Sequence, residues 1–315
     1  MYDFIKTWDL WHYFNHASSV LAGKPVQFEY PYFSLGFMLL PRLFTGDFSL
    51  YSFLFDIQSF IAIALSFFLL WRVVGRQALW FLLPVALLFP MAIELMDIYV
   101  VMLTAIALFF HTQKKIVSSM LFLALGVATK LYPVMILPLV AVKSSRPLIG
   151  GLLLGISVFM ATLNKSGVTF HLERGVQPES IYGSFLYLTG MRQTEYAFNS
   201  IQFAQSSMPI VLSLCILAAL GIWFFFVRRY KNVYDIWFFA VGMFILFSKV
   251  FSPQYLLWLA PFVPFVNIRR KILYGLAVFL TTWYLGFYDL AVVKLVSPYA
   301  WIPVLRNLLL IASLL

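Results

Sequence analysis

The sequence is poor in charge. Charged residues make up 11% of its 315 residues, and only 12 residues are acidic, whereas soluble domains contain roughly 25% charged residues. Hydrophobic residues reach 63%, which is more apolar surface than the core of one soluble domain can bury. These proportions exclude soluble enzymes, disordered proteins and disulfide-stapled secreted domains, and they indicate a multi-pass membrane protein.

Cysteine pairs and nucleotide-binding motifs are also missing. The single cysteine, Cys215, lies in an apolar run, so neither an intrachain disulfide nor a cysteine-based metal site is expected. The sequence contains no G-x-x-x-x-G-K-[ST], no strand-linked G-x-G-x-x-G and no H-E-x-x-H. We therefore expect no metal and no cofactor, and any activated donor must reach the protein through the bilayer.

Apolar runs define the expected membrane segments. A spanning helix needs about 20 apolar residues, and candidate spans lie at 50–71, 78–94, 97–112, 148–163, 208–227, 233–248, 255–268, 272–288 and 300–315. The run 116–142 is interrupted by Lys130 and two prolines, so we expect two short arms that enter and leave the membrane as a hairpin. The run 31–45 is too short to span and is expected to lie on the bilayer as an interfacial helix.

Basic residues fix the expected orientation. They gather in five short connectors, whose one acid, Asp235, lies at the edge of the fourth: Arg72 and Arg76; Lys114 and Lys115; Lys143 and Arg146; Arg228, Arg229 and Lys231; Arg269, Arg270 and Lys271. The positive-inside rule places these connectors in the cytoplasm, and the net charge of +10 then indicates anchoring at the cytoplasmic face instead of nucleic-acid binding. We expect one domain over 1–315 in the plasma membrane, with the long loops 1–49 and 164–207 on the outer side.

The first candidate site surrounds Asp9. If 9–22 is helical, Asp9, His12 or Tyr13, and His16 share one face. A partly buried carboxylate among aromatic side chains has a raised pKa and could take a proton from a sugar hydroxyl. The alternative is that Asp9 caps a helix N-terminus and the aromatic residues form an interfacial belt.

The second candidate site is the outer loop 171–180, which is dense in polar groups. Arg174 could clamp a phosphate through its forked guanidinium, and Glu179 could hold that arginine or bind a sugar hydroxyl. The alternative is a solvated loop with incidental charges.

The third candidate site is the turn 248–255. Lys249 falls on the outer face, against the positive-inside bias, so its charge needs a reason. A lipid-linked phosphate is one reason, and snorkelling to headgroups is the alternative. Gln254 and Tyr255 are expected to begin the next helix, where free N–H groups attract anions.

The fourth candidate site is Lys130, at the broken tip of the hydrophobic hairpin. A charge at membrane depth is tolerated where it lines a cavity or meets a partner. Asp97 is the expected partner, and Glu94 lies one turn before it if the two residues share a helix. The alternative to a functional lysine is a structural ion pair.

The motifs at these sites occur in a recognisable order along nearly the whole chain. They are Asp9 with Tyr13, Leu21-Ala-Gly-Lys-Pro25, Glu29-Tyr-Pro31, Ala128-Thr-Lys-Leu-Tyr-Pro133, Arg174-Gly-Val-Gln-Pro-Glu-Ser180, and Ser252-Pro-Gln-Tyr255 with Trp258. In this order they resemble the GT-C superfamily of integral membrane glycosyltransferases. The sequence is most similar to glycosyltransferase family 87, the polyprenyl-phosphate-mannose-dependent mannosyltransferases once grouped as DUF2029.

The resemblance implies a fold and a reaction. The fold is an all-α polytopic membrane bundle of GT-C type, with about nine to eleven membrane segments, outer-face loops and a juxtamembrane helix. The reaction moves a hexose, with mannose as first candidate, from a polyprenyl-phosphate carrier to a hydroxyl of a glycolipid or polysaccharide on the outer face, with inversion and without a metal.

The resemblance also implies residue roles. Asp9 is the general base, and Arg174, Lys249 and Lys130 stabilise the departing lipid phosphate. The expected substrate contacts are His12, Tyr13, His16, Glu29, Tyr30, Asp97, His171, Gln177, Glu179, Ser180, Gln254 and Tyr255.

The sequence departs from the family in two places. The family has a spanning helix before the catalytic aspartate, whereas residues 1–30 contain neither such a run nor a signal peptide. We therefore expect that a preceding helix is missing from this sequence. The usual Tyr-Pro-Pro is here Tyr30-Pro31-Tyr32.

Two other functions compete with glycosyl transfer. A lipid-linked saccharide flippase or transporter would use the same polar cavity but need no base, so Asp9→Asn separates the two. A structural partner of another membrane complex would bind no lipid carrier at all.

Overall fold

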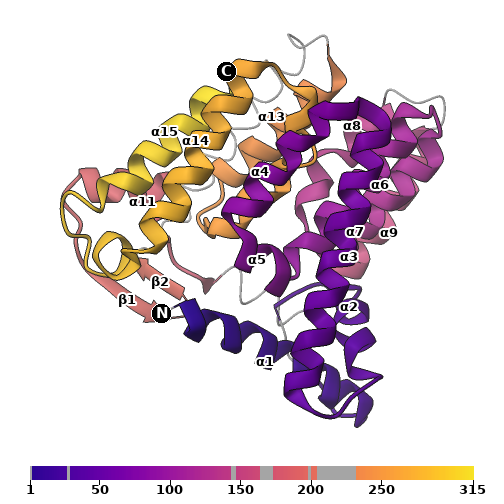
Figure 1. The fold of residues 1–315 in the computed structure, drawn as a ribbon, viewed down its shortest axis with the longest axis horizontal. Coiled ribbons are helices and arrows are strands. Elements are labelled where there is room, and N and C mark those ends of the chain that lie inside the picture. The colour runs from indigo at the N-terminus through magenta and orange to yellow at the C-terminus, as the bar shows by residue number, and fades with distance from the viewer. Residues whose placement is uncertain (1, 27–28, 143–146, 164–172, 198–199, 204–231) are drawn as a thin grey trace. The chain divides into compact units, whose positions relative to one another are not determined.

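The structure is a computed structural model that describes residues 2–26, 29–142, 147–163, 173–197, 200–203 and 232–315. The described residues are mostly helical, which confirms the all-α class at this level. The chain divides into two compact units, Met1–Leu172 and Glu173–Leu315. Figure 1 shows the elements of both, coloured along the chain.

Every regular element among the described residues of the first unit is a helix. Its elements are α1 (Tyr2–Leu21), α2 (Ser34–Arg42), α3 (Phe48–Val74), η1 (Gly75–Ala78), α4 (Leu79–Leu87), α5 (Phe89–Glu94), α6 (Asp97–Thr112), α7 (Ile116–Thr129), η2 (Tyr132–Met135), α8 (Leu137–Val142) and α9 (Pro147–Thr162). Helix α6 packs on both α3 and α7, and α7 packs on α9, which gives a layered bundle (Figure 1). Helix α1 contacts α2, α3 and α5.

One apolar stretch is long enough to cross a bilayer. Asp47 caps the start of α3 by accepting a hydrogen bond from the Leu50 backbone at 2.8 Å. From Phe48 to Leu87 the chain is helical and apolar, and no other described helix passes the same test of length and composition. The other apolar helices are 10–17 residues long, so membrane association is supported and the multi-pass topology stays a prediction.

The run 116–142 is broken at Lys130, as the sequence predicts. Helix α7 ends at Thr129, and Lys130 is extended, with φ −158° and ψ 135°. A Cβ at Gly126 would lie 3.0 Å from the ring of Pro133, so the glycine lets the turn η2 fold back closely on α7. Two short arms result, because a proline ring cannot continue the helical ladder.

Glu94 and Asp97 do not share a helix. Glu94 is the last residue of α5, and Asp97 is the first residue of α6. The condition for lying one turn apart, a shared helix, is therefore not met, because the backbone at Leu95 is extended and separates the two helices.

The second unit combines helices with a hairpin that the sequence analysis did not predict. Its elements are α11 (Ile181–Leu188), β1 (Thr194–Ala197), β2 (Ser200–Phe203), α13 (Val233–Leu246), η3 (Pro253–Leu259), η4 (Val263–Phe265), α14 (Ile268–Leu285), η5 (Asp289–Val293) and α15 (Trp301–Leu314). The strands pair antiparallel, in a register from Thr194↔Phe203 to Ala197↔Ser200. Helices α14 and α15 run side by side (Figure 1).

The expected span 255–268 is not a continuous helix. Two short 3₁₀ segments, η3 and η4, replace it, and each carries a proline in its first turn. The next helix begins at Ile268, before the expected 272, so the basic residues 269–271 lie in its first turn. Arg270 there pairs with Asp235 of α13 at 2.8 Å. The expected span 208–227 and the connectors 143–146 and 228–231 lie outside the described residues.

Candidate functional site

Asp9 lies near the middle of α1, beside the face of the helix that is buried. On this helix Leu10, Tyr13 and Ala17 are buried, while Asp9 is half-buried beside them. Because α1 begins at Tyr2, the alternative that Asp9 caps a helix N-terminus is wrong. The helix therefore presents the carboxylate at the edge of its packed face.

The surroundings of Asp9 favour its protonated form. Burial raises the pKa of Asp9 to about 7, and Glu29 raises it further, while the positive charge of Lys130 lowers it. The carboxylate makes no hydrogen bond or ion pair with any described residue. A carboxylate with a pKa near neutrality and no internal partner is suited to accept a proton from a substrate.

Two tyrosines join α1 to the segment before α2. The hydroxyl oxygens of Tyr13 and Tyr30 are 3.3 Å apart, and the buried Tyr13 ring packs against Phe55 of α3 at a centroid distance of 5.6 Å. The ammonium of Lys130 lies 5.2 Å from the centre of the Tyr30 ring. These contacts place Tyr13, Tyr30 and Lys130 in one cluster.

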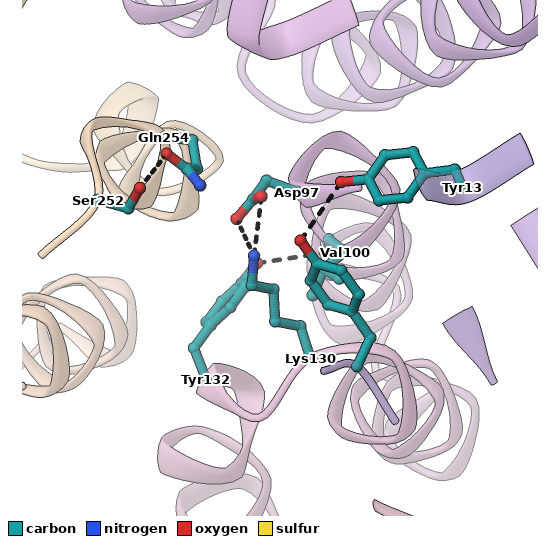
Figure 2. A network of polar contacts seen from close by, with 8 residues as sticks. Tyr13, Asp97, Val100, Lys130, Tyr132, Ser252 and Gln254 are labelled. Atoms are coloured by element: carbon teal, nitrogen blue, oxygen red, sulfur yellow. Dashed lines mark hydrogen bonds and ion pairs between the residues drawn. The ribbon is translucent and has the colours of Figure 1, made fainter. Parts of the chain in front are cut away.

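Lys130 and Asp97 form the expected ion pair. The Lys130 ammonium lies 2.8 Å from both carboxylate oxygens of Asp97 (Figure 2). Beside the pair, the Tyr132 hydroxyl contacts Thr104 at 2.7 Å and the Val100 carbonyl at 3.3 Å. Because Asp97 already neutralises Lys130, this geometry favours the structural ion pair over direct phosphate binding by Lys130.

The two histidines of α1 form an aromatic row. The His12 ring lies edge-on to Trp8 at 4.9 Å and stacks on His16 at 6.0 Å. Burial lowers the pKa of His16, and the neighbouring His12 lowers it further. The buried Nε2 of His12 finds no hydrogen-bond partner within the described part of the chain.

In the second unit, Arg174 and Lys249 lie on neighbouring segments. The backbone N–H of Gln177 donates to the carbonyl of Lys249 at 3.0 Å, which ties the loop of Arg174 to the turn of Lys249. Burial lowers the pKa of Lys249, and the positive charge of Arg174 lowers it further. The two cations are thus close enough to repel, and an anion between them would relieve that repulsion.

The loop around Glu179 is packed into the unit. Residues 176–180 are all buried, so the alternative of a solvated loop is wrong for this part. Tyr284 donates to one carboxylate oxygen of Glu179, and Tyr288 donates to the other at 3.3 Å. Burial raises the pKa of Glu179. The carboxylate is thus held by protein donors and does not face solvent.

Ser180 begins α11 as its N-cap. Its hydroxyl accepts from the Gly183 backbone at 2.9 Å and donates to the Gln177 carbonyl at 2.8 Å. A side chain at Gly183 would collide with that same carbonyl oxygen. Ser180 therefore shapes the loop and offers no hydroxyl at the surface.

The turn before η3 differs from the expected helix start. Pro253 occupies its first turn, the Ser252 side chain donates to Gln254 Oε1 at 2.5 Å (Figure 2), and no side-chain cap is formed. The Tyr255 ring stacks on Trp258 at 4.0 Å. Gln254 and Tyr255 thus begin a 3₁₀ helix and not an α-helix, and the expectation of a free N–H is wrong for Tyr255, which donates to the Ser252 carbonyl at 2.9 Å.

Sequence reasoning missed the donors that hold Glu179. Arg306 and Asn307 both donate to its carbonyl, at 2.7 Å and 3.1 Å. With Tyr284 and Tyr288 they lie more than a hundred positions away, inside apolar runs. The sequence does contain one sign of these contacts. Arg306 lies in an expected spanning run, and a charge there needs a polar partner.

Each unit thus holds its own set of expected site residues. The first unit brings together Asp9, Tyr13, Tyr30, Asp97 and Lys130, and the second brings together Arg174, Gln177, Glu179, Ser180 and Lys249. His171 lies outside the described residues. Comparison with known proteins adds no family: no protein-family model, no curated protein and no solved structure matches the chain.

Proposed function

We propose that this chain is a membrane hexosyltransferase. It moves a hexose, with mannose as the first candidate, from a polyprenyl-phosphate carrier to a hydroxyl of a glycolipid or polysaccharide at the extracytoplasmic face. The proposal draws on the resemblance to glycosyltransferase family 87 and on the chemistry of the two residue sets.

The state of Asp9 is the observation that carries the proposal. Its half-buried carboxylate has a pKa of about 7 and no hydrogen bond or ion pair to a described residue. A carboxylate that served only structure would be satisfied by a donor, as Asp97 is by Lys130. The rings of Tyr13 and Tyr30 pack edge to face beside this carboxylate, at a centroid distance of 6.1 Å.

In the proposed reaction Asp9 accepts the proton of the acceptor hydroxyl. The acceptor oxygen forms a bond to the anomeric carbon as the bond from that carbon to the phosphate oxygen breaks. The electron pair of the broken bond leaves with the polyprenyl phosphate, and the anomeric centre inverts. Direct displacement of this kind needs one base and no covalent enzyme intermediate.

Arg174 and Lys249 are proposed to bind the donor phosphate. Negative charge grows on this group as the sugar departs, so cations held beside it stabilise the transition state more than the ground state. The hydrogen bond from the Gln177 N–H to the Lys249 carbonyl at 3.0 Å keeps the segments of the two cations together, which supports an anionic ligand for the pair.

The proposal is tested by measuring mannose transfer from radiolabelled polyprenyl-phosphate mannose. The assay uses membranes that contain the full-length chain. The variants are Asp9→Asn and, as a matched control, Asp47→Asn, because asparagine caps a helix as well as aspartate does. We expect Asp9→Asn to lower transfer by about 10²–10⁴-fold with donor binding retained, and Asp47→Asn to leave transfer unchanged. Full activity of Asp9→Asn would refute the assigned base, and movement of intact donor without transfer would favour the flippase.

A further inference from the structure

The guanidinium of Arg306 is fully buried. The side chain is 0% exposed, and its Nε and Nη1 donate no hydrogen bond within the described residues. Glu179 supplies an opposite charge nearby, but no ion pair joins the two side chains among the described residues, and burying a charge without one costs free energy. Such a residue is a costly way to stabilise a fold, so its contacts deserve a functional explanation.

Arg306 touches both segments that carry the proposed phosphate-binding cations. Its Nη2 donates to the backbone carbonyl of Glu179 at 2.7 Å, five positions after Arg174 in the loop 174–180. Its Cζ lies 3.6 Å from the centre of the Phe251 ring, two positions after Lys249 in the turn 248–252. One side chain of α15 therefore lies against both segments.

Other bonds make the loop 174–180 rigid around this contact. Asn307 donates to the same Glu179 carbonyl at 3.1 Å and to Ser184 at 2.9 Å. On the other side, the Gly175 N–H donates to Gln202 Oε1 at 2.6 Å, and Arg174 Nε donates to Ser200 at 3.1 Å. The loop is thus held at both ends, by α15 and by the strand β2.

The segments of the two cations are joined directly as well, because the Gln177 N–H donates to the Lys249 carbonyl at 3.0 Å. If these backbones were free, an anion would have to draw Arg174 and Lys249 together at a cost in binding free energy. A backbone held in advance removes that cost, which is what an electrostatic binding site requires.

We propose that Arg306 is a positioning residue that holds the loop 174–180 and the turn 248–252 together, so that Arg174 and Lys249 form a preorganised site for a phosphate monoester or diester. This inference rests on the proposed function. Arg306 does not touch the phosphate in this proposal. It acts through the Glu179 carbonyl and the Phe251 ring.

Equilibrium binding of farnesyl phosphate, with farnesol as the uncharged probe, tests the inference. The purified full-length chain is compared with Arg306→Gln, Arg306→Lys and Asn307→Ala. We expect about tenfold weaker binding of farnesyl phosphate to Arg306→Gln, a smaller loss for Arg306→Lys and Asn307→Ala, and unchanged farnesol binding. Arg270→Gln is the matched control, since Arg270 is also a buried arginine of this unit but pairs with Asp235.

A second background separates positioning from general damage. In Arg174→Ala/Lys249→Ala, the further change Arg306→Gln is expected to have little effect on farnesyl phosphate binding, because the groups it positions are gone. Equal losses in both backgrounds, or a loss for Arg270→Gln as large as that for Arg306→Gln, would overturn the inference. If Arg306→Gln does not fold, Arg306→Lys and Asn307→Ala decide it, and full affinity in both overturns it.

The same assay keeps the two proposals apart. A wild-type chain that binds farnesyl phosphate no better than farnesol overturns the proposed donor site. The other outcome is that the wild-type chain prefers farnesyl phosphate to farnesol and that the Arg306 and Asn307 variants show the same preference. The proposed function then stands, and only the positioning role of Arg306 is refuted.

Discussion

The ammonium of Lys130 lies 2.8 Å from both carboxylate oxygens of Asp97. The Asp97 side chain is 1% exposed, and the Lys130 side chain is 14% exposed. The pair fixes the first turn of α6 to the break after α7, where neither backbone can supply a continuous helical ladder.

Removal of one partner of this pair should destabilise the first unit. Lys130→Met leaves the Asp97 carboxylate buried without its cation, which costs about 3–5 kcal/mol. The double variant Lys130→Met/Asp97→Leu removes both charges and should recover much of that loss. Thermal unfolding of the purified protein in detergent measures both, and a single variant as stable as the wild type would contradict the prediction.

The transfer activity should depend on pH through Asp9. The base must be deprotonated to accept a proton, and its pKa is about 7. We therefore expect kcat/KM to fall about tenfold for each pH unit below the midpoint and to level off above it. A profile that is flat from pH 5 to pH 8, measured with radiolabelled donor, would exclude Asp9 as the titrating group.

Neighbouring charges should move that midpoint in opposite directions. Glu29 raises the pKa of Asp9 and Lys130 lowers it, so Glu29→Gln should shift the profile to lower pH and Lys130→Met should shift it to higher pH. Glu195→Gln, at an exposed position of the second unit, is the control and should leave the midpoint in place. Shifts of the same sign in the first two variants would contradict the assignment.

The exposed apolar face of α9 should contact lipid. Its exposed side chains are Leu148, Leu152, Ile156 and Phe159, at 85%, 63%, 50% and 62%. In a Cys215→Ser background, Leu152→Cys in intact membranes should resist a water-soluble maleimide, whereas Glu173→Cys should react. Both should react after denaturation in SDS. Rapid labelling of Leu152→Cys in membranes would place this face in water.

The sequence predicted the ends of helices well where a charge or a proline interrupts an apolar run. The break at Lys130 follows from a charge and a proline in one run, and the partnership with Asp97 follows from the rule that a charge at membrane depth needs an opposite charge. The prediction of one helix over 255–268 was wrong, because composition alone does not distinguish a continuous helix from 3₁₀ turns when prolines recur.

Arg306 signals by its charge that it needs a partner, but the sequence could not show that Glu179 is the residue where the four donors meet, because they come from distant positions. Tyr284, Tyr288, Arg306 and Asn307 meet one short loop only through tertiary packing, which no local period encodes. The hairpin of β1 and β2 was missed for a related reason: four-residue strands in a polar loop carry too little alternation to stand out.

The close fit between Gly126 and Pro133 limits how this chain can diverge. Since a methyl group at 126 would press on the proline ring at 3.0 Å, a homologue with alanine at this position should carry a smaller or more mobile residue at 133. The two positions should therefore co-vary across an alignment, and a set of relatives could reveal the folded-back turn before any of their structures is known.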